Sequence, residues 1–353
     1  GRECDILHVG WADRSLGGAY HSVYYQTFNV TTRQWVGSPT RIATADAAQQ
    51  QGVFSRDIAV TPLGTVVIAV GVGANGGQGM GAWDCGLLVR KAGSATFSSL
   101  FPMRNASLPN AFPWSREASI VLTEEVAHCA FKSLKGAGGM AYRSFDTETL
   151  VWQQAAEVMV GPAENGIKGL NGINAGNKGM ITADTSGGLY ITYITGSKGG
   201  LSGNNKMRMA YASSGTGSKN SDWSDLEILA HNDTIGNNPR GVVSGDPAYP
   251  QLQGGDTDYY NYTVCQGLGN AVFVVYSKPW EDFQNKYMQI WLDGANQPFP
   301  TKEIQYWADT EPYVFERLGA MRNTGSLGHG AWVVYGKNDQ PTPGQAPNGW
   351  VRM

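Results

Sequence analysis

The sequence is poor in charge and has no long apolar runs. Charged residues make up 16% of the 353 residues, and the formal net charge is −3. Because the lysines and arginines are scattered and do not outnumber the acids, a nucleic-acid or anionic-membrane surface is not expected. The longest apolar run, Thr65 to Val72, has the length of a strand, whereas a membrane helix needs about 20 apolar residues. We therefore expect no membrane span.

Cysteine is also scarce, with only Cys4, Cys85, Cys129 and Cys265 present. None of them forms a CxxC pair, so a zinc site is not expected. The glycine-rich runs 71–81 and 196–203 lack the ending of a phosphate-binding loop, and we expect no cofactor. The even number and wide spacing of the cysteines permit two disulfides, and four buried free thiols are an equally good interpretation.

The N-terminal residue is not methionine, and no secretory segment is visible, which indicates a processed chain or a fragment. Four N-x-S/T sequons occur, at Asn29, Asn105, Asn232 and Asn261. They permit a glycoprotein with an extracellular, cell-surface or virion-surface location.

Short β-type runs separated by Gly, Asn, Asp and Ser make up most of the chain, and no stretch has convincing helical periodicity. Five hairpins have their tight turns near residues 64, 124, 187, 269 and 328, so most intervals are close to 60 residues. Each hairpin is followed by a third short strand and a weaker fourth one, which in several repeats ends in tryptophan (Trp35, Trp152, Trp223, Trp307). Four antiparallel strands in each unit of this length are typical of a β-propeller blade.

The sequence therefore predicts an all-β chain that forms one β-propeller domain of about six four-stranded blades, with seven as the alternative. The expected blades are approximately 1–50, 51–112, 113–170, 171–245, 246–310 and 311–353. The innermost strand of the first blade and the fourth strand of the last blade are missing from this pattern. We expect the propeller to be incomplete at both termini, and the open strand edges to favour assembly with another segment or chain.

Several segments resemble the repeats of the sialidase superfamily, among them Ile6 to Asp13, Trp35 to Ile42 and Asp57 to Val60. That superfamily carries the Asp box, S-x-D-x-G-x-x-W, in the turn between the third and fourth strands of a blade. The segment Ser213 to Trp223 lies at this place, but it lacks the Asp and has extra residues, and 29–35 and 146–152 keep only the turn and the Trp. The resemblance implies a six-bladed propeller and does not by itself imply sialidase activity.

Three arginines, Arg56, Arg116 and Arg317, stand immediately before inner strands of the predicted blades. Residues at the starts of inner strands converge on one mouth of a propeller channel, where three guanidinium groups would bind a carboxylate or a sulfate. The resemblance to sialidases implies the same use of arginine. The alternative is that each arginine pairs with its adjacent acid and stabilises the channel.

Candidate catalytic residues are fewer. Tyr259 and Tyr260, with Asp258 beside them, lie near an inner-strand start and match the tyrosine and acid that a sialidase-like mechanism would use. His21 lies in a mouth-side loop, where a lyase would use histidine and tyrosine as acid and base. Trp11 and Trp280 are candidates for stacking on sugar rings. Packing between blades is the alternative for each of these residues.

Three functions remain open. The incomplete Asp boxes, the unfinished sheets and the low charge favour a non-catalytic surface propeller that binds a glycan or protein partner, such as a repeating subunit of a filament or virion appendage. The arginine spacing and the tyrosine cluster favour the alternative, a carbohydrate-active enzyme on an acidic glycan, either a sialidase-like hydrolase or a polysaccharide lyase. An intracellular scaffold is the third reading, because fold does not fix function.

Overall fold

The computed structural model describes residues 5–13, 22–43, 51–74, 84–103, 118–133, 139–160, 163–164, 167–168, 179–195, 206–229, 262–266, 270–277, 285–296, 304–308, 317–321, 332–339 and 348–352. Most of these residues lie in β-strands, and the one helix among them is a single 3-10 turn, η1 (Asn220–Asp222). Within the described ranges no helix is long and apolar enough to cross a membrane. The chain divides into two compact units, residues 1–159 and 160–353.

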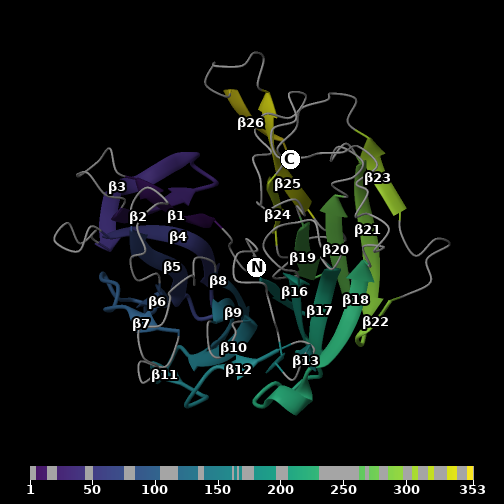
Figure 1. The fold of residues 1–353 in the computed structure, drawn as a ribbon. Coiled ribbons are helices and arrows are strands. Elements are labelled where there is room, and N and C mark those ends of the chain that lie inside the picture. Colours follow the sequence, from purple (N-terminus) through teal and green to yellow (C-terminus); the bar gives the residue numbers. More distant parts are fainter. Residues whose placement is uncertain are drawn as a thin grey trace. The chain divides into compact units, whose positions relative to one another are not determined.

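In its described residues the first unit contains three antiparallel sheets, drawn in purple to teal in Figure 1. Sheet 1 consists, in order, of β1 (Ile6–Asp13), β2 (Ser22–Asn29) and β3 (Gln34–Ala43). Sheet 2 consists of β4 (Gln51–Val60), β5 (Val66–Ala74), β6 (Asp84–Arg90) and β7 (Phe101–Pro102). Sheet 3 consists of β8 (Ala118–Thr123), β9 (Val126–Ser133), β10 (Gly139–Asp146) and β11 (Val151–Trp152), with β12 (Val158–Met159) also paired to β10.

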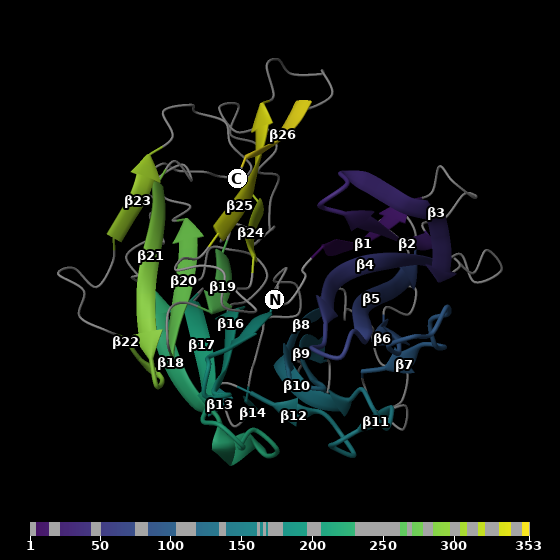
Figure 2. The same cartoon turned by 180° about the vertical axis from the view of Figure 1, so that it is seen from behind.

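The second unit begins with a short hairpin, β13 (Ala163–Glu164) and β14 (Ile167–Lys168). Sheet 4 consists of β15 (Met180–Ala183), β16 (Leu189–Thr195), β17 (Lys206–Ala212) and β18 (Ser224–Leu229). Sheet 5 consists of β19 (Tyr262–Gln266), β20 (Ala271–Ser277), β21 (Asn285–Leu292) and β22 (Ala295–Asn296), and β23 (Ile304–Ala308) pairs with β21. Sheet 6 consists of β24 (Arg317–Met321), β25 (Trp332–Asp339) and β26 (Asn348–Arg352), and the strands of sheets 4 to 6 run from teal to yellow in Figure 2.

These sheets are the blades of a β-propeller, and the predicted fold class is confirmed. In each blade the strands pair antiparallel in chain order. Within the first unit the first strand of sheet 2 lies beside the first strand of sheet 3, and within the second unit β19 lies beside both β15 and β24. Six sheets of this kind are present in the described residues, and the first and last of them have three strands there.

Strand β5 shows why these segments fold as central strands. All residues from Val66 to Val70 are buried. Because side chains alternate between the two faces of a strand, Val66, Ile68 and Val70 enter the core shared with sheet 1. Val67 and Ala69 enter the core shared with sheet 3. A strand covered on both faces needs a continuous apolar run, and burying each large side chain stabilises the fold by about 1.5–3 kcal/mol.

Sheet 1 repeats the last three strands of sheet 3 residue by residue. Four positions of β1, β2 and β3 correspond to four of β9, β10 and β11, namely His8 to His128, Tyr25 to Tyr142, Phe28 to Phe145 and Trp35 to Trp152. The Phe28 and Trp35 rings meet edge to face with their centroids 5.3 Å apart and their planes at 71°. The corresponding rings in sheet 3 are 5.0 Å apart at 69°.

The turns that leave β2 and β10 are equivalent as well. In the first, Asn29 Oδ1 accepts a hydrogen bond from the Thr32 backbone N–H at 2.8 Å. In the second, Asp146 Oδ1 accepts one from the Thr149 backbone N–H, also at 2.8 Å. Both turns then place a left-handed residue at the same position, Arg33 with φ 55° and Leu150 with φ 61°. Strands β1 to β3 are therefore the second, third and fourth strands of a blade.

Candidate functional site

Three side chains of the first unit form a hydrogen-bonded chain between sheets 1 and 2. The Tyr25 hydroxyl lies 2.5 Å from His8 Nδ1, and an N–H of the Arg90 guanidinium donates to the same hydroxyl at 2.9 Å. The guanidinium carbon also lies 4.8 Å from the centre of the Tyr25 ring and 5.7 Å from that of Phe97. We call His8, Tyr25 and Arg90 the His–Tyr–Arg site.

Burial sets the charges of this site. Burial, and then the positive charge of Arg90, lower the pKa of His8, so the imidazole is neutral at neutral pH. Burial raises the pKa of Tyr25, and the opposing effects of Arg90 do not cancel it, so the phenol keeps its proton. Arg90 supplies a permanent positive charge that contacts the Tyr25 phenol.

The hydrogen bonds determine where the protons lie. Arg90 has only donors, so the Tyr25 oxygen accepts from it. The phenol proton is then left for His8 Nδ1, and a neutral imidazole bonded in this way carries its own proton on Nε2. No described residue bonds His8 Nε2, and the His8 side chain is only partly buried. The site thus presents a polarised N–H donor beside a guanidinium group.

Sheet 3 contains the same histidine–tyrosine pair, but there both imidazole nitrogens have hydrogen-bond partners. The Tyr142 hydroxyl lies 2.7 Å from His128 Nδ1, and the Thr123 hydroxyl lies 2.5 Å from Nε2. Both imidazole nitrogens are therefore engaged, and burial lowers the pKa of His128 to about 4. Thr123 ends β8, the first strand of its sheet, which has no counterpart among the described strands of sheet 1. The pair itself is a packing feature of the repeat, and what distinguishes sheet 1 is Arg90 and the unbonded Nε2.

Arg56, one of the predicted arginines, is exposed on a bulge of β4, where the pairing with β5 shifts between Ser55 and Asp57. The Asp57 carboxylate holds β4 against the neighbouring strand β8. Its Oδ2 accepts from the Ser119 hydroxyl at 3.0 Å and from the Ile120 N–H at 2.8 Å. These bonds place Arg56 close to the start of β8, which Arg116 precedes in the sequence.

The other predicted site residues are placed as follows. Trp11 lies on β1, is partly exposed and stacks on Tyr24 with a centroid separation of 5.9 Å. Arg317 begins β24 of the second unit, and its side chain lies outside the described part. The remaining candidates for catalysis, binding and glycosylation also lie outside the described residues, namely His21, Arg116, Asp258, Tyr259, Tyr260, Trp280, Asn105, Asn232 and Asn261.

For two of the four cysteines the structure decides between the two interpretations, and these two do not form disulfides. Cys85 and Cys129 are both free thiols and fully buried in the core between sheets 2 and 3. Burial, together with the neighbouring Cys85, raises the pKa of the Cys129 thiol well above its usual value, so it stays protonated. These cysteines act as small apolar side chains. Cys4 and the side chain of Cys265 lie outside the described part.

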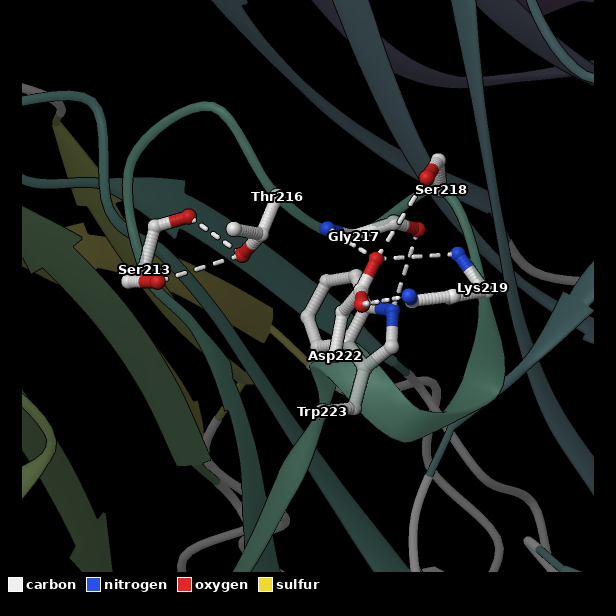
Figure 3. A network of polar contacts seen from close by, with 7 residues as sticks. All are labelled: Ser213, Thr216, Gly217, Ser218, Lys219, Asp222 and Trp223. Atoms are coloured by element: carbon white, nitrogen blue, oxygen red, sulfur yellow. Dashed lines mark hydrogen bonds and ion pairs between the residues drawn. The ribbon is translucent and has the colours of Figure 1, made fainter.

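In the Asp-box-like turn from Ser213 to Trp223, the stabilising acid is Asp222, near the C-terminal end of the turn (Figure 3). Asp222 Oδ2 accepts hydrogen bonds from the backbone N–H groups of Gly217 and Lys219 at 3.0 and 3.1 Å. The indole N–H of Trp223 donates to the Gly217 carbonyl at 3.2 Å, and the indole is buried. This network fixes the conformation of the loop between β17 and β18, and the hydrogen bonds described here join groups within that loop.

No group of three or more His, Cys, Asp or Glu side chains that could hold a metal ion occurs in the described ranges. The His–Tyr–Arg site was not anticipated from the sequence. The signal that could have found it is a recurring pattern, His-x-x-aromatic followed by Tyr-x-x-Phe-Asn/Asp, which occurs at His8 and Tyr25 and again at His128 and Tyr142. The partner Arg90 belongs to another blade, so no local pattern predicts it.

Comparisons with solved structures agree with the fold. The chain is similar to a protein of unknown function from Dyadobacter fermentans, at 12% identity and a TM-score of 0.53, covering 99% of this chain and 91% of that one. It is also similar to an ulvan lyase of polysaccharide lyase family PL25, at 9% identity and a TM-score of 0.53, covering 99% of this chain and 76% of that one. The fold is shared. No protein-family model and no curated protein matches the sequence, so the resemblance to sialidase repeats stays a prediction.

Proposed function

We propose that this protein is a carbohydrate-active enzyme that cleaves an acidic glycan. The observation that carries the proposal is the His–Tyr–Arg site, because it combines a proton donor with a permanent cation at one place on the first unit. Cleavage of a glycosidic bond needs a proton for the departing oxygen, and an acidic glycan needs a positive charge beside its carboxylate or sulfate.

The proposed step follows from the proton positions. The bond between the sugar carbon and the departing oxygen breaks with its electron pair on oxygen, and that oxygen takes the proton from His8 Nε2. His8 Nδ1 takes the hydroxyl proton of Tyr25 across their 2.5 Å contact. The resulting phenolate keeps its hydrogen bond from Arg90, and the guanidinium charge stabilises it. The imidazole remains neutral throughout.

This step is common to two reactions. Hydrolysis then adds the hydroxide of a water molecule to the carbon that the oxygen has left, and the water proton returns through His8 to the Tyr25 phenolate. Elimination instead removes a proton next to the sugar carboxylate, returns it by the same route, and leaves a carbon–carbon double bond. Both reactions were open alternatives for the predicted enzyme. The ulvan lyase of the same fold is a polysaccharide lyase, and this supports elimination and a polymeric substrate.

Two further features support an acidic substrate. A guanidinium has five N–H donors, so Arg90 retains donors for a glycan after it has bonded Tyr25. Arg56, which the sequence predicts to bind a carboxylate or sulfate together with Arg116 and Arg317, is exposed on the same unit. The enzyme is supported better than the non-catalytic binding module that the incomplete Asp boxes, the unfinished sheets and the low charge favour, because a binding module has no use for a polarised imidazole.

The test is a cleavage assay on a panel that contains a polyuronate, a sulfated polyuronate, a sialylated glycan and a neutral polysaccharide. New reducing ends report either reaction, and ultraviolet absorbance of a new double bond reports elimination alone. The wild-type protein should cleave an acidic member and leave the neutral one intact. If no acidic member is cleaved, the proposal is wrong.

A matched pair of variants tests the site itself. Tyr25→Phe removes the hydroxyl that supplies the proton, and kcat should fall by about 100-fold or more. Tyr142→Phe removes the equivalent hydroxyl of the histidine–tyrosine pair in sheet 3, and kcat should stay within about twofold of wild type. Thermal unfolding checks that both variants are folded. Equal activity of Tyr25→Phe and wild type would remove the His–Tyr–Arg site from the mechanism.

A further inference from the structure

The turn after β2 has a chemical feature that its twin in sheet 3 does not share. We propose that Asn29 is an acceptor for an N-linked glycan. The sequon Asn29-Val30-Thr31 is one of four in the sequence, and it is the one whose acceptor lies in the described residues. This proposal rests on the turn alone and is independent of the proposed activity.

The turn needs only one atom of the Asn29 side chain. Its oxygen, Oδ1, accepts the 2.8 Å hydrogen bond from the Thr32 N–H that closes the turn. Asp146 does the same task in sheet 3 with a carboxylate oxygen, which accepts from the Glu148 and Thr149 N–H groups at 2.9 and 2.8 Å. An aspartate therefore satisfies this turn, and the amide nitrogen of Asn29 is not required for folding. Among the described residues it has no hydrogen-bond partner.

The threonine hydroxyl that anchors each turn stands at a different sequence position in the two sheets. In sheet 3 the residue after Asp146 is Thr147, whose hydroxyl donates to the Glu125 carbonyl at 2.7 Å. In sheet 1 the residue after Asn29 is Val30, and the hydroxyl is found one position later, on Thr31, where it donates to Asp5 Oδ1 at 2.6 Å. The same anchoring is thus achieved with threonine at the second position after asparagine, which is where a sequon requires it.

A glycan at this position projects into solvent. The segment from Val30 to Thr40 is exposed throughout, and Val30 itself has 51% of its surface accessible. Asn29 ends β2 and is partly exposed, so its amide nitrogen lies at the margin of the sheet and not beneath it. A large hydrophilic substituent is accommodated in the folded protein without displacing core residues.

The modification is a transfer catalysed by the oligosaccharyltransferase of a secretory host. The amide nitrogen of Asn29 bonds to the anomeric carbon of a lipid-diphosphate-linked oligosaccharide. The bond between that carbon and the phosphate oxygen breaks, the lipid diphosphate leaves with the bonding electrons, and the amide gives up one proton. The proposal therefore also implies passage through a secretory compartment, which agrees with the extracellular location expected from the sequence.

The experiment expresses the full chain with a secretion signal in a eukaryotic cell and analyses the protein recovered from the medium. Trypsin cuts after Arg14 and Arg33, so residues 15–33 form one peptide that contains this sequon alone. Mass spectrometry before and after treatment with peptide-N-glycosidase should find this peptide glycosylated, and the enzyme should convert Asn29 to aspartate.

Two variants make the result specific. Asn29→Asp keeps the oxygen that the turn uses and removes the acceptor nitrogen, so the glycan should disappear while the thermal midpoint of the deglycosylated protein is unchanged. Thr31→Ser keeps the sequon and should keep the glycan at reduced occupancy. An unmodified 15–33 peptide in secreted wild-type protein overturns the proposal, whether or not the other three sequons carry sugar.

Discussion

The phenols of Tyr25 and Tyr142 occupy equivalent positions in two blades, and each contacts the Nδ1 atom of a histidine on the preceding strand. Their second partners differ. Tyr25 receives a hydrogen bond from the Arg90 guanidinium, whereas Tyr142 has the neutral Ser144 hydroxyl as its second neighbour, and that hydroxyl donates its proton to Gln153 Oε1 at 2.6 Å. A positively charged donor stabilises a phenolate far more than a hydroxyl does. The two pairs therefore share a geometry and differ in the chemistry open to them.

Replacing Arg90 by methionine should slow glycan cleavage with little loss of packing. The methionine side chain still covers the Tyr25 and Phe97 rings, but the hydrogen bond and the charge at the Tyr25 oxygen are lost. A hydrogen bond to a charged group contributes about 1.5–3 kcal/mol, so kcat should fall by about 10- to 100-fold. Steady-state kinetics measure the change. Arg90→Lys keeps the charge and should retain more activity, and the reverse order of the two variants would contradict this role.

Asp57 should contribute to stability through the contact between sheets 2 and 3. Its carboxylate accepts hydrogen bonds from the Ser119 hydroxyl and the Ile120 N–H of β8. Asp57→Ala leaves the Ile120 N–H without this acceptor, and an unsatisfied buried donor costs about 1–3 kcal/mol. Urea unfolding should show a lower midpoint by the corresponding amount. Asp57→Asn keeps an acceptor oxygen and should lose less, and equal losses would assign the effect to charge instead of to the hydrogen bonds.

The stability of the first unit should fall as the pH drops from about 6.5 to about 4. His128 has a pKa of about 4 in the folded protein because it is buried, and its ordinary value is about 6.5. Between these values the unfolded chain binds a proton that the folded chain does not, so the free energy of unfolding decreases as the pH is lowered. The total loss from this group is about 3 kcal/mol, measurable by denaturant titration at several pH values.

His128→Gln is the control for this pH dependence. Glutamine keeps hydrogen-bonding groups between Thr123 and Tyr142 but does not titrate. The variant should be less stable than wild type at neutral pH and should lose less stability on acidification. If its free energy of unfolding falls as steeply as that of wild type between pH 6.5 and 4, another group causes the effect.

Gly294→Ala should destabilise the second unit more than Gly215→Ala. Both glycines have φ of 73°, so each alanine carries the same backbone penalty of about 1–2 kcal/mol. A Cβ at Gly294 would lie 2.4 Å from Cδ1 of Tyr211, whereas a Cβ at Gly215 meets nothing within 4 Å. The difference between the two variants measures the clash, about 1–3 kcal/mol. Equal thermal midpoints would mean that the Tyr211 ring moves aside at no cost.

The repeat pattern was enough to predict the architecture. Hairpins at regular intervals depend on local sequence, and the turns near residues 64, 124 and 187 lie between paired strands as expected. Local sequence also predicted a third short strand after each hairpin, and β10 and β17 confirm it for two of the blades. These features need no knowledge of which blades touch.

The site could not be predicted in the same way. Arg90 reaches Tyr25 across 65 positions of the chain, and the role of Asp57 appears only when β8 is placed beside β4. Asp222 holds the turn between β17 and β18 from a position that the S-x-D-x-G-x-x-W spacing does not contain, so that spacing does not reveal it. The sequence left the state of the cysteines open because disulfide formation depends on the distance between two sulfur atoms in space, and spacing along the chain does not give that distance.

The two buried thiols Cys85 and Cys129 can serve as probes of how often the core between sheets 2 and 3 opens. Cys85 and Cys129 belong to different sheets and have no accessible surface in the folded state. A thiol-specific alkylating reagent reaches them only when sheets 2 and 3 separate, so the rate of their modification follows the opening of that core. The modification rates of Cys85 and Cys129 would therefore measure how often sheets 2 and 3 separate under native conditions.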